Sequence, residues 1–157
     1  MPRRIREGPE LLLLDTHVWI WYVESTERKL SRGALTVLRN HDRAGLLSVS
    51  PLSVWEIGTL VAKKRLTLSV DVLTWMRTAI EEASIRTAEL TPAIALDAAL
   101  LGGTPPQDPA DRILIATARA LGATLVTRDA EILAYGRAGH VRVMDAGGDP
   151  HPLSPSP

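Results

Sequence analysis

Short apolar runs and amphipathic stretches alternate along this chain, and their spacing predicts alternating strands and helices. Residues 11–14 form a continuous apolar run, which is typical of a strand buried on both faces of a sheet. Further strands are predicted at residues 46–48, 85–90, 124–127 and 141–143. Helices are predicted between them at residues 16–23, 31–43, 51–65, 72–83, 92–101, 109–121 and 130–135.

Polar caps followed by proline mark the start of three of these helices. The pairs are Ser50-Pro51, Thr91-Pro92 and Asp108-Pro109, and in each the proline has the backbone angle that the first helical position needs. Gly122 ends the third of these helices. Strands that alternate with helices imply βαβ units, so we predict an α/β fold, a three-layer α/β/α sandwich with a central, mostly parallel sheet.

The length of 157 residues favours one domain, which we assign to residues 11–145. Residues 1–10 are polar and basic and predict a flexible arm, while residues 146–157, rich in Gly, Pro and Ser, predict a disordered tail. No stretch approaches the roughly 20 apolar residues of a membrane span. The apolar run at residues 11–14 is too short for an export signal, so we expect a cytoplasmic protein that does not enter a membrane.

Composition and charge exclude some kinds of site. The chain has no cysteine, so it has neither disulfides nor a thiolate nucleophile or metal ligand. Its 18 basic and 18 acidic residues give a formal net charge of zero. Overall charge therefore gives no support for nucleic-acid binding, which would have to depend on local patches.

Four acidic residues occupy positions that can share one edge of the predicted sheet. Asp15 follows the first strand directly, and Asp129 lies two residues beyond the strand at 124–127. Glu56 lies on the helix after the second strand, and Asp111 lies in the first turn of the helix that Asp108-Pro109 opens. Because ligands of open α/β sheets bind outside the carboxyl ends of the strands, we predict that these four acids face one site.

Helix capping is the alternative explanation for most of these acids. Asp15, Asp108 and Asp129 each precede a predicted helix, where an aspartate cap is worth about 1 kcal/mol. Asp111 would favour the helix dipole at the third helical position. Capping explains Glu56 worst: Ser53 and Glu56 have the spacing of a capping box, but Ser50-Pro51 already begins the helix earlier.

A divalent cation would account for all four acids together. Crowded carboxylates repel one another, and bound Mg²⁺ or Mn²⁺ relieves that repulsion because hard cations prefer oxygen ligands. Such ions polarise phosphate groups and lower the pKa of bound water. The sequence therefore predicts a metal site suited to phosphoryl chemistry.

Four segments of the chain resemble PIN-domain ribonucleases, most of all VapC-type toxins of bacterial type II toxin–antitoxin systems. They are residues 12–19, 53–57, 108–118 and 125–129, in the order and at the spacing of that family. The resemblance implies a five-stranded parallel sheet flanked by helices. It also implies Mg²⁺- or Mn²⁺-dependent cleavage of RNA, a small cognate antitoxin and a homodimer. The ten-residue arm is an addition to the family's usual pattern.

The same resemblance assigns the catalytic and metal-binding roles. They map to Asp15, Glu56, Asp111 and Asp129. Asp108 belongs to the subgroup's Asp-Pro-x-Asp-Arg pattern and is a candidate additional acid. We hypothesise that Asp15 and Asp111 hold the principal ion, while Glu56 and Asp129 complete the site and orient the attacking water.

Several neighbours of the acids are candidates for substrate binding, each with a structural alternative. Thr127 would hydrogen-bond a phosphate, a ligand or water, or would only end its strand. Arg112 and Arg128 would contact the RNA backbone, or would only balance the adjacent acids. The basic residues 63–65 would contact RNA or favour a helix end. For His17 we expect a packing role.

The four tryptophans are predicted to lie mostly in the core, with one or two exposed at a dimer or antitoxin groove. They are Trp19, Trp21, Trp55 and Trp75, in a chain without phenylalanine. Tryptophan is favoured at the energetic centres of protein interfaces. Base stacking is the alternative for an exposed tryptophan.

Three rival functions were weighed against the ribonuclease. A phosphatase of the haloacid dehalogenase type would need a second aspartate at position 17, where this chain has His17. A nucleotide-binding domain would need a glycine-rich loop between a strand and a helix, and neither Gly102-Gly103 nor Gly147-Gly148 has that position. A PIN-like module that binds RNA or protein without cutting would be expected to lack an acid, and all four are present.

Overall fold

A central sheet of five parallel strands organises the molecule. The computed structural model describes residues 10–26 and 29–148. The strand order is β3-β2-β1-β4-β5, and every neighbouring pair in it is parallel. The strands are β1 (Leu12–Leu14), β2 (Leu47–Val49), β3 (Arg86–Thr87), β4 (Thr124–Thr127) and β5 (Val143–Asp145).

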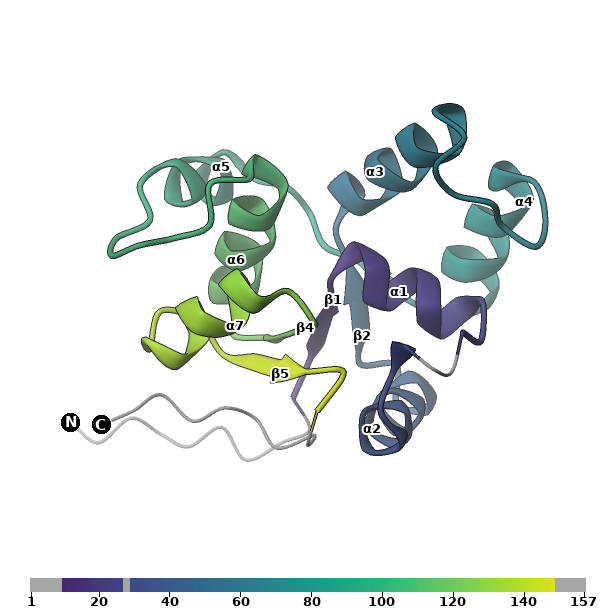
Figure 1. Cartoon of the computed structure of the whole chain (residues 1–157), viewed down its shortest axis with the longest axis horizontal. Coiled ribbons are helices and arrows are strands. Elements are labelled where there is room, and N and C mark those ends of the chain that lie inside the picture. Colours follow the sequence, from purple (N-terminus) through teal and green to yellow (C-terminus); the bar gives the residue numbers. More distant parts are fainter. Residues whose placement is uncertain (1–9, 27–28, 149–157) are drawn as a thin grey trace.

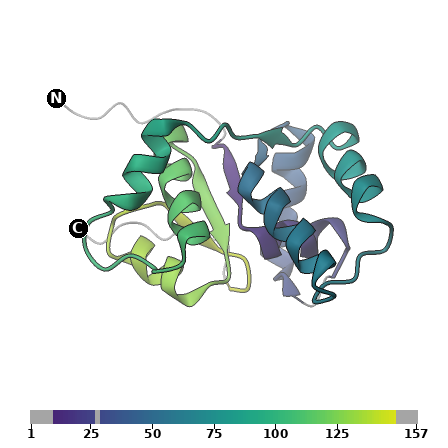
Figure 2. The ribbon, with the colours of Figure 1, turned by 90° about the horizontal axis from the view of Figure 1, so that it is seen from above.

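Helices cover both faces of this sheet, as Figures 1 and 2 show. One face carries α1 (Thr16–Val23), α2 (Arg32–Arg43), α3 (Pro51–Ala62), α4 (Val72–Met76) and the π-helix η2 (Arg77–Glu82). The other carries α6 (Pro109–Leu121) and α7 (Ala130–Arg137), with α5 (Pro92–Ala99) packed on α6. The predicted α/β/α sandwich is confirmed, and its sheet is wholly parallel.

Alternation along the strands divides the core into two layers. On β1, Leu12 and Leu14 contribute to the layer under α1 and α2, while Leu13 contributes to the layer under α6 and α7. All three are buried, since successive side chains of a strand point to opposite faces. The continuous apolar run that predicted this strand therefore reflects helices on both sides of it.

The caps that the sequence predicted begin the helices where expected. Ser50 accepts a hydrogen bond from the amide of Leu52, with Pro51 at the first helical position. Asp108 caps α6, and Gly122 ends it in the left-handed conformation, with φ of 61°. These boundaries depend on local hydrogen bonds, which explains why the local sequence located them.

Several predicted boundaries differ from the structure. Helix α3 ends at Ala62 and not near residue 65, because Lys64 turns left-handed (φ of 57°) and the Arg65 amide bonds to the Leu60 carbonyl. This is the bonding of a helix C-cap. The predicted strand at residues 85–90 shortens to β3, which pairs only with β2 at the sheet's edge. The predicted helix at 72–83 divides into α4 and η2.

The last strand is displaced from its predicted position by two residues. Strand β5 covers Val143–Asp145 because its pairing with β4 sets Leu125 opposite Val143 and Thr127 opposite Asp145. Ala146, which the sequence placed in the tail, is buried, and its amide bonds to the Thr127 carbonyl at 2.9 Å. The predicted arm, apart from Glu10, and the tail beyond residue 148 lie outside the described residues. None of the described helices is long and apolar enough to cross a membrane.

Candidate active site

The acids that the sequence singled out line one cavity at the carboxyl edge of the sheet. Asp15 follows β1, Asp129 follows β4, Glu56 lies on α3 and Asp111 lies in the first turn of α6. Together with Asp108 they line a cavity of about 370 Å³. The expectation that strand ends would bring these four acids together is confirmed. Their catalytic and metal-binding roles remain predictions.

Three of these carboxylates are also helix caps, so the two explanations are compatible. Asp15 accepts from the amide of Thr16 at 2.7 Å, and Asp108 accepts from the amide of Asp111 at 3.1 Å. Asp129 accepts through a single oxygen from two amides at the start of α7, at 2.9 and 3.0 Å. A carboxylate has about four acceptor positions, so each cap leaves acceptor capacity for the cavity. Capping therefore fixes the orientation of these side chains at the site.

Thr127 joins two of the acids. Its hydroxyl donates to Oδ2 of Asp15 at 2.7 Å and accepts from the backbone amide of Asp129 at 3.0 Å. The side chain is completely buried at the end of β4, next to β1. A positioning contact of this kind was not expected from the sequence. A contact of Thr127 with a substrate remains a prediction.

Glu56 is held by the hydroxyl of Thr16, which the sequence did not single out and which is also hydrogen-bonded to Ser53. The Thr16 hydroxyl donates to Oε1 of Glu56 at 2.8 Å and shares a hydrogen bond of 2.7 Å with the Ser53 hydroxyl. Ser53 is buried and is not the cap of α3, which is Ser50. The three-residue spacing places Ser53 and Glu56 on one face of α3, but it does not reveal that Thr16 contacts them both.

Burial and mutual repulsion raise the pKa values of these carboxyl groups. Burial first, and then the charges of Asp108, Asp15, Asp129 and Glu56, raise the pKa of Asp111 to about 7. Burial also raises the pKa of Asp15, against the hydrogen bond from Thr127, and that of Glu56, against the hydrogen bond from Thr16. The site therefore concentrates negative charge that a cation would stabilise.

A basic and aromatic rim completes the cavity. Arg128, His17 and Trp21 all line it. The Arg128 guanidinium lies 5.8 Å from the centre of the Trp21 ring and donates to the Lys29 carbonyl at 2.9 Å. His17 is exposed, with its ring centre 5.8 Å from that of Trp21. The expectation that His17 serves packing missed its place at the site.

Two other candidate groups of basic residues are not among the residues that line this cavity. Arg112 is half-buried in the first turns of α6. Residues 63–65 are exposed and follow the end of α3. A role in RNA binding remains a prediction for both.

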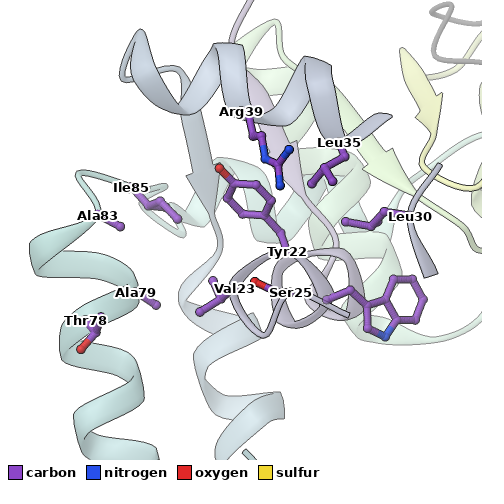
Figure 3. A pocket seen from close by; sticks show the side chains of 11 residues that line it. Tyr22, Val23, Ser25, Leu30, Leu35, Arg39, Thr78, Ala79, Ala83 and Ile85 are labelled. Atoms are coloured by element: carbon purple, nitrogen blue, oxygen red, sulfur yellow. The ribbon is translucent and has the colours of Figure 1, made fainter. Parts of the chain in front are cut away.

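Two of the four tryptophans are buried, fewer than the sequence predicted, and the expected place of an exposed one at a dimer or antitoxin groove stays a prediction. Trp19 and Trp75 are buried and meet edge to face, with ring centres 5.1 Å apart. Trp55 on α3 has 65% of its surface exposed. Trp21 is half-buried and lines both the acidic cavity and a second cavity of about 300 Å³. This second cavity lies between α1, α2 and η2 and has mostly apolar walls (Figure 3).

The donor set fits a hard divalent cation, although the carboxylates do not form a closed cage. Five carboxylates from four segments face one cavity, and the pKa of Asp111 is raised by the other four. Across residues 10–26 and 29–148, no three acidic or imidazole groups are close enough to surround an ion on their own. Mg²⁺ keeps several waters and needs only one or two carboxylates, so an open arrangement suits it.

Comparisons with known proteins agree with this fold. The PIN domain family model matches residues 12–138. Ribonuclease VapC22 of Mycobacterium tuberculosis is 35% identical over 124 residues, which cover 79% of this chain and 91% of that protein. The chain therefore belongs to the PIN-domain family, and within that family to the VapC type.

Solved structures share the fold at lower sequence identity. VapBC2 from Rickettsia felis, solved bound to a DNA fragment from its promoter, matches with a TM-score of 0.57 at 14% identity. The match covers 85% of this chain and 96% of that one. FitAcB from Neisseria gonorrhoeae matches with a TM-score of 0.52 at 21% identity, over 87% of this chain and 98% of that one.

Proposed function

We propose that this protein is a metal-dependent endoribonuclease and the toxin of a type II toxin–antitoxin system. The observation that carries the proposal is the cavity lined by Asp15, Glu56, Asp108, Asp111 and Asp129, in which the pKa of Asp111 rises to about 7. Membership of the VapC type supports the choice of RNA as substrate. The cytoplasm, where RNA and an antitoxin are available, is the proposed place of action.

Asp15 and Asp111 would hold Mg²⁺ or Mn²⁺, with Glu56 and Asp129 completing the site. The bound ion would polarise the phosphate and lower the pKa of a bound water. The chain's own residues keep the acids oriented. Thr127 fixes Asp15, and Thr16 fixes Glu56, each through one hydrogen bond. Such preorganisation matters because small displacements of catalytic groups are costly in rate.

Arg128 would contact a phosphate of the RNA backbone. It lines the cavity together with the acids. Its guanidinium lies over the Trp21 ring and donates a hydrogen bond to the Lys29 carbonyl, and these two contacts hold it in place. A guanidinium can donate two parallel hydrogen bonds to a phosphate. Arg128 would also offset the repulsion between the acids and the negatively charged substrate.

A cleavage assay on single-stranded RNA tests the activity. Protein freed of any bound partner is incubated with Mg²⁺, with Mn²⁺ or with a chelator. Cleavage is expected only with metal, and Asp15→Asn and Asp111→Asn are expected to lower it by at least about a hundredfold. Asp97→Asn is the matched control, since Asp97 pairs with Arg119 on α5 and α6. If both cavity variants cut like wild type, the assignment is wrong.

The alternative is a PIN-like module that binds RNA or a protein without cutting. It predicts that the wild-type chain leaves RNA intact with either metal, while still retaining labelled RNA or a partner. Asp15→Asn would then leave that retention unchanged. The presence of all four acids favours the enzyme over this alternative.

The apolar cavity between α1, α2 and η2 would receive an apolar side chain of a small antitoxin. Trp21 supports this choice, because it lines both this cavity and the acidic one, so a bound segment would continue toward the acids. Thr78→Arg, at an exposed position of the lining, should weaken binding of the protein encoded by the neighbouring upstream gene by about tenfold. Thr67→Arg, exposed outside the cavity, is the control for titration calorimetry.

A further inference from the structure

A third cavity adjoins the acidic one on the side of α7. It measures about 650 Å³ and lies between the loop at residues 103–107 and the exposed side of α7. Its described lining residues are Gly103, Thr104, Pro105, Pro106, Gln107, Glu131, Ala134, Tyr135, Ala138 and His140. Figure 1 shows α6 and α7, the helices that flank this loop in space, on the same side of the sheet.

The residues that line the two cavities are neighbours along the chain at two places. Gln107 lines the third cavity, and the next residue, Asp108, lines the acidic one. On α7, Asp129 lines the acidic cavity, and Glu131, two residues later, lines the third. Because the two linings come within one or two residues of each other at both places, we infer that a nucleotide whose phosphate lies in the acidic cavity can extend its base toward the third one.

The wall of the third cavity is preformed. The Tyr135 and His140 rings stack with their centres 4.3 Å apart, and the Tyr135 hydroxyl donates to the Gly102 carbonyl at 2.6 Å. The loop lies directly against His140, because a Cβ on Gly103 would meet its Nε2 at 2.6 Å. Gly103 also has φ of 69°, a conformation that glycine adopts readily. A site that is already ordered loses little entropy when a ligand binds.

The chemistry of the lining suits a neutral, flat, polar-edged ligand. The described residues that line this cavity include no lysine or arginine, so they offer no cationic group to pair with a phosphate. The acidic cavity differs in this respect, because Arg128 lines it. Proline rings and the His140 imidazole offer flat apolar surfaces. Gln107 and Glu131 offer an amide and a carboxylate, which pair with the donors and acceptors on the edge of a base. Unstacked RNA bases are recognised by such combinations of stacking and edge hydrogen bonds.

We propose that this third cavity is a nucleobase pocket, which receives the base of the nucleotide next to the scissile phosphate. The Glu131 carboxylate only accepts hydrogen bonds, so it favours a base that presents an exocyclic amino group, whereas uracil offers only its ring N–H. The pocket gives the enzyme a sequence preference at that position. This inference rests on the proposed ribonuclease function, and it names the residues that would set its specificity.

Cleavage of matched RNAs tests the pocket. One RNA carries an intact base at each position flanking the cut, and its partners carry an abasic nucleotide at one of those positions. Wild type should cut one abasic partner about tenfold more slowly, as expected for a stacked base. Ala134→Leu, which fills the pocket from an exposed helical position, should cut the intact and the abasic RNA at nearly the same rate, so the ratio of the two rates falls to near one. Ala120→Leu, exposed on α6 outside the pocket, should keep it.

Base preference provides the second readout. Glu131→Gln should reduce the discrimination against uracil at the pocket position, measured by sequencing the cut ends of a randomised RNA. The pocket is overturned, and the ribonuclease function is not, in either of two cases. In the first, wild type cuts the intact RNA and every abasic partner at the same rate. In the second, Ala134→Leu distinguishes intact from abasic RNA as strongly as wild type does. No cleavage of any RNA by wild type overturns the proposed function itself.

Binding of free nucleosides separates the pocket from the activity. Cytidine, guanosine, adenosine and uridine at millimolar concentration are titrated without metal, and the His140 imidazole is followed by NMR. The amino-bearing nucleosides should shift this resonance in wild type, and the shift should be lost in Ala134→Leu. If no nucleoside shifts it, or if the shift persists in Ala134→Leu, the pocket is wrong whatever the activity assay finds.

Discussion

Thr127 at the end of β4 donates a hydrogen bond of 2.7 Å to Asp15 at the end of β1, two strands that pair directly in the sheet. The pairing sets Val126 beside Leu14, so the next residues of the two strands meet at the same edge. The same hydroxyl accepts the amide of Asp129. One buried threonine thus links two acids that are 114 residues apart in the sequence.

Thr127→Val removes this link while keeping the shape of the side chain. We expect the pKa of Asp15 to rise further, because the lost hydrogen bond lowers it in the wild type. The acidic limb of the pH–rate profile should move to higher pH. The free energy of unfolding should fall by about 1–3 kcal/mol, the usual effect of losing a hydrogen bond to a charged group. Urea denaturation and the pH dependence of cleavage measure the two effects.

Thr124→Val is the matched control on the same strand. The Thr124 hydroxyl is buried and has no hydrogen-bond partner among residues 10–26 and 29–148, so its removal should leave stability unchanged or increase it. If both valine variants lose the same stability, the Thr127 bond contributes nothing of its own.

Asp111 should make the stability of the metal-free chain depend on pH. Its pKa of about 7 in the folded protein exceeds the ordinary value of 3.8, so the folded state binds the proton more tightly than the unfolded state. The stabilisation from this proton is complete below about pH 4 and is lost as pH rises to about 7. Allowing for solvent screening, we expect a difference of roughly 1–2 kcal/mol across this range.

Asp111→Asn should remove most of that pH dependence and stabilise the metal-free protein at neutral pH. The raised pKa values of Asp15 and Glu56 act in the same direction, so a smaller slope should remain. Urea denaturation in a chelator from pH 4 to 8 measures it. If the free energy of unfolding of Asp111→Asn changes with pH as steeply as that of wild type, Asp111 is not the source of the pH dependence.

Divalent metal should stabilise the fold through the acidic cavity. Binding to the folded state alone adds about 2.7 kcal/mol at one hundred times the dissociation constant, or roughly 5–10 °C in melting temperature for a chain of this size. Thermal denaturation with Mn²⁺ or a chelator measures this shift. Asp15→Asn and Asp111→Asn should lower it at least by half, while Asp97→Asn keeps it. An undiminished shift in both variants would locate the ion elsewhere.

Gly136 on α7 should tolerate no side chain. A Cβ there would lie 2.3 Å from Cγ2 of Val143 on β5, so Gly136→Ala should lower the free energy of unfolding by about 1–3 kcal/mol. Adding Val143→Ala should recover part of this loss. Gly58→Ala on α3 meets nothing within 4 Å and should stabilise the protein by about 0.5–1 kcal/mol. Chemical denaturation of these three variants tests the contact.

The sequence by itself determined the features that depend on neighbouring residues. The Ser50 and Asp108 caps, the glycine end of α6 and the apolar runs of β1 and β4 are local, and the structure has them where the pattern predicted them. The acids at strand ends followed from the same logic, because parallel strands bring their carboxyl ends to one edge.

The tertiary structure alone decided the features that depend on pairing across the chain. The two-residue displacement of β5 follows from its register with β4, and the burial of Ala146 follows from its bond to Thr127. The supports of the site belong here too: Thr127 on Asp15, and Thr16 with Ser53 on Glu56. Hydroxyl side chains have no periodicity that reveals their partners. What they bind depends on which strand or helix lies next to them, and only the folded sheet sets that.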